Sequence, residues 1–91
     1  MIPGKLYKLK RGNQSQQVGF VIKGLTASVQ LLGSTSIPAD TSEMEDCTDG
    51  ETLTNGTWQF GMLPEYIAFV GAGTDSIDIL GMSYDDLGTI A

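Results

Sequence analysis

The sequence predicts an all-β fold, a small antiparallel β-sandwich or barrel of about seven or eight short strands with hairpin connections. Glycine accounts for 12 of the 91 residues and aromatic residues for only seven, a balance typical of short strands joined by tight turns. No stretch of about ten residues places apolar side chains at helical spacings. Short apolar or alternating segments recur instead, separated by small and polar residues.

The chain length predicts one domain, residues 1–91. A domain of this size buries roughly 60 to 65% of its unfolded surface, which is near the lower limit for folding alone. Binding to other copies would stabilise it by mass action, so we expect self-association.

The first third of the chain predicts three strands. Residues 5–11 alternate polar and apolar side chains, and their lysines suit an edge strand, where charge discourages pairing with other chains. In the next two strands the core-facing residues are Val18, Phe20 and Ile22 in the second, and Ala27, Val29 and Leu31 in the third.

Residues 40–51 form an acidic surface segment with six carboxylates in twelve residues. Pro38 cannot donate a hydrogen bond to a sheet, so we expect the chain to leave the sheet there. Part of the segment fits either an exposed strand or a single helical turn capped by Asp40 or Ser42. The sequence leaves both alternatives open.

The pair Asn55-Gly56 predicts a hairpin. Both residues favour positive φ, which a type I′ turn between residues 52–54 and residues 57–60 requires. Trp58 and Phe60 lie on one face of the second of these strands, and we expect them in the core.

Residues 71–75 predict the turn of a second hairpin, between strands at residues 65–70 and 76–80. The first of these strands is apolar on both faces. It belongs either in the middle of a two-layer structure or at a contact with another chain. Ile67 and Phe69 are our candidates for that second layer or subunit contact.

Residues 83–91 are predicted to close the chain as a C-terminal tail. Tyr84, Leu87 and Ile90 recur every three residues, so the tail can dock an apolar stripe on its own domain or on a neighbour.

Charge is distributed unevenly along the chain. All five cations lie within the first 23 residues and all eleven carboxylates from residue 40 onward, with a net charge of −6. The asymmetry fits either ordinary solvated charge or a basic edge that meets an acidic edge of another subunit. So few cations argue against a nucleic-acid partner. The absence of a long apolar run argues against a membrane span and a secretory signal, so we expect synthesis in the cytoplasm.

The composition argues against an enzyme, and we expect no cofactor and no metal centre. Histidine is absent, which excludes histidine bases and histidine metal ligands. The single cysteine, Cys47, fits a partly buried small side chain. The acidic segment does not match an EF-hand; a looser cation site at Asp46, Asp49 and Glu51 is the alternative to a solvated charge run.

Four segments, taken together, resemble a type of small β-sandwich protein found among the virion components of tailed bacteriophages. They are residues 27–34, 56–58, 63–70 and 71–79. In that type they correspond to a strand, a tryptophan hairpin, a second strand and a glycine turn into a last alternating strand. The resemblance covers residues 25–82 and departs at residues 40–51, where a short loop is expected.

The resemblance implies a head decoration or cement protein. Such a protein is a structural virion component that coats the capsid, binds the major capsid protein lattice and strengthens the shell. The expected partners are the major capsid protein and further copies of this chain, with a cyclic trimer as one such assembly. The basic strand would meet acidic patches on the shell or the next copy. The candidate contact residues are Lys5, Lys8, Lys10, Arg11, Ile67, Phe69, Tyr84 and Leu87.

A different class of function stays open, that of a carbohydrate- or receptor-binding module of a phage tail or surface protein. In that case Trp58, Tyr66 and the loop acids would form the binding surface. A third possibility is a cytoplasmic assembly factor that is absent from the finished particle.

Overall fold

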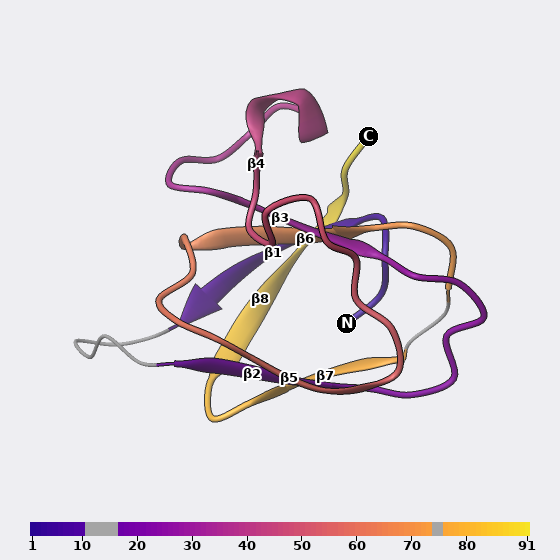
Figure 1. Ribbon diagram of the computed structural model, residues 1–91. Coiled ribbons are helices and arrows are strands. Elements are labelled where there is room, and N and C mark those ends of the chain that lie inside the picture. The colour runs from indigo at the N-terminus through magenta and orange to yellow at the C-terminus, as the bar shows by residue number, and fades with distance from the viewer. Residues whose placement is uncertain (11–16, 74–75) are drawn as a thin grey trace.

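The computed structural model describes residues 1–10, 17–73 and 76–91, which form a sandwich of two antiparallel sheets (Figure 1). The predicted all-β class is confirmed. The larger sheet has the order β4-β3-β6-β1-β8 and the smaller sheet the order β5-β2-β7. The larger sheet consists of β1 (Lys5–Lys10), β3 (Gln30–Ser34), β4 (Glu45–Asp46), β6 (Tyr66–Val70) and β8 (Ser83–Thr89). The smaller sheet consists of β2 (Val18–Ile22), β5 (Gly56–Phe60) and β7 (Ile77–Leu80), and a 3-10 turn, η1 (Thr41–Glu43), precedes β4.

Most connections cross from one sheet to the other. Within the described residues, β3 and β4 are the only consecutive strands that pair, so every other connection joins the two layers (Figure 1). Both predicted hairpins are therefore wrong. Strand β5 pairs with β2 rather than with residues 52–54, and β7 pairs with β2 rather than with β6.

The Asn55-Gly56 pair makes a loop contact instead of a hairpin turn. The Asn55 side chain accepts a hydrogen bond from Leu25 N at 2.9 Å and donates one to Leu25 O at 3.0 Å. Leu53 forms a bridge with Val29 through two backbone hydrogen bonds of 2.9 and 2.7 Å. Val29 thus satisfies the backbone groups of Leu53 that a hairpin would have used.

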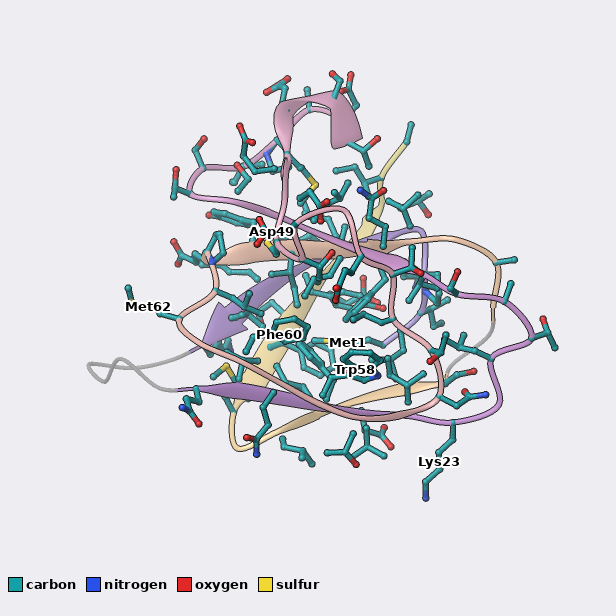
Figure 2. The ribbon with its side chains drawn as sticks, viewed as in Figure 1. Met1, Lys23, Asp49, Trp58, Phe60 and Met62 are labelled. Carbon is teal, nitrogen blue, oxygen red and sulfur yellow. The ribbon has the colours of Figure 1, made fainter. Side chains whose placement is uncertain are left out.

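The main core lies between the two sheets. Phe20 packs edge-on against Phe60 and Phe69, with ring centroids 5.9 and 5.3 Å apart. Figure 2 shows Met1, Trp58 and Phe60 directed into the space between the layers. The predicted core-facing residues Val18, Phe20, Ile22, Val29 and Leu31 are buried, whereas Ala27 is exposed in a bend ahead of β3.

Strand β6 occupies the centre of the larger sheet and is buried on both faces. Ile67 and Phe69 face the smaller sheet and are fully buried. Tyr66 and Ala68 face the other way, into a second cluster that includes Met44 of the acidic segment. The two-layer alternative for this strand is confirmed, and neither face of β6 is left for another chain.

Strand β1 lies in the interior of the larger sheet, between β6 and β8, so the prediction of an edge strand is wrong. The predicted C-terminal tail is also wrong, because residues 83–89 form β8 and occupy that edge. Beyond β8, Ile90 N donates to Gly4 O at 3.0 Å, and Thr41 N donates to Ala91 O at 2.7 Å. These bonds hold the last residues against the sheet.

Replacing Ile67 by Ala should lower the free energy of unfolding by about 2 to 5 kcal/mol, because the substitution removes fully buried methyl groups and leaves a cavity. Urea unfolding measures the loss. Val70→Ala, at the exposed end of the same strand, is the control and should cost less than about 1 kcal/mol. Equal losses for the two variants would contradict the double burial of β6.

Replacing Gly33 by Ala should cost about 1 to 3 kcal/mol through overpacking. A Cβ atom at Gly33 would lie 2.8 Å from Cys47 Sγ and 2.9 Å from the rigid Pro64 ring at Cγ. Gly61→Ala is the matched control, since nothing lies within 4 Å of its Cβ position. Thermal unfolding should show a lower Tm for Gly33→Ala alone, and partial recovery when Cys47→Ala is added.

Candidate functional site

The basic side chains of β1 pair with acidic side chains of the same chain. The three ion pairs are Lys5 Nζ to Asp86 Oδ2 at 3.2 Å, Lys8 Nζ to Glu65 Oε1 at 3.7 Å and Lys10 Nζ to Asp85 Oδ1 at 3.1 Å. Such exposed pairs contribute only about 0 to 1 kcal/mol each to stability. They do balance the charge of β1 within the chain, so the described lysines of β1 do not form an uncompensated basic patch, and their role as contact residues stays a prediction. Arg11 lies outside the described residues.

Ile67 and Phe69 were candidate subunit contacts, and the structure contradicts that role. Both side chains are completely buried between the two sheets. A partner could reach them only if the sandwich opened. They pack against the second sheet, which is the other alternative that the sequence left open for them.

Tyr84 and Leu87 lie on β8 and remain accessible, with 37% and 45% of their surface exposed. The Tyr84 ring packs edge-on against the buried ring of Tyr7 at a centroid distance of 5.2 Å. Gly88, at φ 96°, donates its N–H to Asp86 Oδ1 at 2.9 Å, where the register with β1 shifts. This hydrogen bond lowers the pKa of Asp86. A bulge beside acidic side chains disfavours the addition of another strand at this edge.

Residues 40–51, named here the acidic cap, cover the outer face of the larger sheet through Met44. Both structures left open by the sequence occur in it: η1 is capped by Asp40, whose carboxylate accepts from Ser42 N at 2.9 Å, and β4 pairs with β3. Bonds from the Ser42 side chain and backbone lower the pKa of Asp40. The acidic cap is therefore folded against the sheet.

Asp46 organises the second half of the acidic cap. Its carboxylate accepts hydrogen bonds from Thr48 N at 2.9 Å, Thr48 Oγ1 at 2.8 Å and Gly50 N at 2.6 Å. The bonds from Thr48 lower the pKa of Asp46 most. Within the described ranges, no group of three or more His, Cys, Asp or Glu side chains could hold a metal ion. Of the three carboxylates proposed for a loose cation site, that of Asp46 is engaged in these turn hydrogen bonds.

Cys47 is half-buried beside Gly33. Burial, and then the charge of Asp46, raise the pKa of its thiol. A thiol with a raised pKa stays protonated at neutral pH and is a weak nucleophile. The arrangement suits a packing role, as the sequence predicts.

Trp58 and Tyr66, the aromatic pair of the carbohydrate-binding alternative, lie on different sheets. Trp58 is half-buried in β5, and its Nε1 donates to Thr54 O at 2.8 Å. Tyr66 is buried in β6 beneath the acidic cap. Stacking on a sugar requires exposed ring faces on one surface. These two residues do not form such a surface.

Sequence reasoning missed the two most exposed large apolar side chains in the described part of the chain, Ile37 and Met62, at 68% and 69% exposure. Ser34 at the end of β3 lies opposite Tyr66 at the start of β6, so the loops with Ile37 and Met62 meet the sheet at the same end. We call this region the apolar end. A groove of about 380 Å³ at this end is lined by Thr35, Met62, Leu63, Pro64 and Glu65.

The sequence gives little indication of the apolar end, because Ile37 and Met62 are each isolated apolar residues in a segment that favours turns. Neither Ile37 nor Met62 belongs to an alternating pattern that predicts a strand. The one available sign is an isolated aliphatic side chain among residues that favour turns.

No protein-family model matches the sequence, and no curated protein or solved structure is significantly similar to it. Among the residues described, no helix has both the length and the apolar character needed to cross a membrane.

Acidification should loosen the acidic cap before the sheets unfold. The lowered pKa values of Asp40 and Asp46 mean that their carboxylates stabilise the fold above the ordinary value of 3.8, and that this contribution disappears as the pH falls through the lowered values. The protection factors of the Thr48 and Gly50 amides, which are exchange rates normalised to those of an unstructured chain at the same pH, should therefore fall below pH 3.8. The variant Asp46→Ala should show that loss of protection already at neutral pH, whereas Glu51→Ala, which removes an exposed carboxylate from the same segment, is the control. Unchanged protection in Asp46→Ala would contradict this role.

Proposed function

We propose that this protein is a non-enzymatic structural component of a virion, a capsid decoration or cement protein that binds the major capsid protein lattice and stabilises the head. The sequence resemblance over residues 25–82 supports this proposal. The chemistry of the exposed surface supports it independently. In this proposal the chain is made in the host cytoplasm, resides on the capsid surface and also binds further copies of itself.

The apolar end carries the proposal. Ile37 and Met62 are aliphatic and more than two-thirds exposed, and Met62 lines a groove of about 380 Å³. Removing such side chains from water stabilises a complex by roughly 25 cal/mol per Å² of buried apolar area. Methionine also adapts its shape to a partner surface because its side chain is flexible. The apolar end therefore fits a protein partner.

The acidic cap points to the orientation of the bound protein. None of its six carboxylates pairs with a cation of the described residues. Burying these charges without partners would be costly, so the acidic cap stays in solvent. Repulsion between the caps of neighbouring copies also disfavours stacking through this face.

The carbohydrate-binding alternative has weaker support. Its two aromatic residues, Trp58 and Tyr66, are on separate sheets, and the ring of Tyr66 is buried. The exposed apolar surface is mainly aliphatic, which favours contact with protein over stacking on sugar rings.

Replacing both Ile37 and Met62 by Ser should weaken binding to capsid shells at least about tenfold, because the partner would lose the apolar contact. Co-sedimentation with purified shells that lack the protein measures the affinity. Leu80→Ser is the matched control, since Leu80 is also an exposed aliphatic residue but lies on β7. All variants should keep the Tm of the wild type within a few degrees.

Two results would overturn the proposal. The first is a wild-type protein that neither binds shells nor is present in purified virions, which would favour the assembly factor. The second is a protein whose tryptophan fluorescence changes when sugars are added and which does not bind shells, which would favour the recognition module. Equal shell binding by the Ile37→Ser, Met62→Ser variant and the wild type would remove the apolar end as the contact.

A further inference from the structure

The outer edge of β5 lacks the features that protect the other sheet edges. At those edges, β4 has only two residues, β7 carries Asp78, and β8 carries Asp85, Asp86 and a bulge. Strand β5 contains no charge, no proline and no bulge, and it pairs with β2 over five consecutive positions. Such an open, regular edge is able to accept another strand.

The surrounding sequence and packing also favour strand addition at β5. Residues 52–64 contain no charged side chain. Trp58 and Phe60 pack against the core, which fixes the inner face of the strand, whereas Thr57 and Gln59 are exposed. The described residues place no further strand beside β5.

We propose that β5 pairs antiparallel with β5 of a second copy about a two-fold axis at Trp58, so that two three-stranded sheets form one six-stranded sheet. This inference deepens the self-association in the proposed function and rests on that part of it, not on shell binding. The occupant is a second copy because the strand is complementary to itself.

The register centred on Trp58 makes that complementarity explicit. Thr57 faces Gln59 of the second copy, and Gly56 faces Phe60 of the second copy. Polar side chains thus oppose polar side chains, and the missing side chain of glycine leaves room for the aromatic ring. Directly opposed residues of an antiparallel pair share one face, so the inner faces of both sandwiches stay continuous. All five residues of β5 are used.

Electrostatic repulsion between the copies is small in this arrangement. The chain carries a net charge of −6 and would repel itself at most surfaces. Figure 1 shows residues 40–51 over the outer side of the larger sheet, while β5 lies in the other layer. The strongly acidic surface therefore lies away from the pairing edge, and solvent salt screens what remains.

Two double variants test the pairing. T57K/Q59K places lysine opposite lysine in the proposed register, whereas T57E/Q59K places glutamate opposite lysine. Light scattering of the wild type should give twice the 9.7 kDa of one chain. T57K/Q59K should be monomeric at the same concentration, and T57E/Q59K should again be dimeric. Both positions are exposed, so circular dichroism should show folded proteins.

A cysteine pair provides a second measurement that does not depend on those variants. In a Cys47→Ser background, a mixture of Thr57→Cys and Gln59→Cys chains should form a disulfide-linked dimer upon oxidation, because the two positions face each other. Asp78→Cys on β7, mixed with Gln59→Cys, is the control and should not cross-link.

Several results would overturn the inference: a wild-type monomer or trimer, a T57K/Q59K variant that remains dimeric, a T57E/Q59K variant that remains monomeric, or preferential linkage to Asp78→Cys. The last result would indicate head-to-tail pairing of β5 with β7. All these measurements are made without shells. A negative outcome therefore leaves the shell-binding test unaffected, and a failure of shell binding leaves the dimer test unaffected.

Discussion

The burial of β6 on both faces is the constraint on which the rest of the structure depends. Ile67 and Phe69 require cover on one side, and Tyr66 and Ala68 on the other. The smaller sheet covers the first pair, and the acidic cap, through Met44, covers the second. Each fully buried large apolar side chain contributes about 1.5 to 3 kcal/mol relative to exposure. A domain of this size can therefore leave neither face open.

This constraint also decides which surfaces remain for partners. The lysines of β1 pair with carboxylates of the same chain, and the acidic cap is anchored by its own turns. Among the described residues, the two surfaces that we propose for partners are the apolar end beside the larger sheet and the unprotected edge of β5 in the smaller sheet. Because different parts of the fold carry these surfaces, the two proposals are compatible: one copy would use the first surface for a different protein and the second for another copy of itself.

Local patterns located most strands but misassigned their neighbours. The alternation in Val18, Phe20 and Ile22 predicted a buried face correctly. The Asn55-Gly56 turn signal failed because β5 pairs with β2, and the Asn55 side chain binds Leu25 just beyond the end of β2. Residues 83–89 looked like a tail because Asp85, Asp86 and Gly88 interrupt the alternation, and their partners on β1 are distant in sequence. The apolar end was missed because its residues come from two separate loops.

The sequence by itself determined the all-β class, the buried face of β2 and the need to cover both faces of β6. These properties follow from side-chain alternation and composition, which act locally. Tertiary structure alone decided the strand order, the interior position of β1 and the intrachain ion pairs. The physical reason is that backbone N–H and C=O groups pair equally well with many strands. Only the simultaneous burial of all the apolar faces selects one set of neighbours.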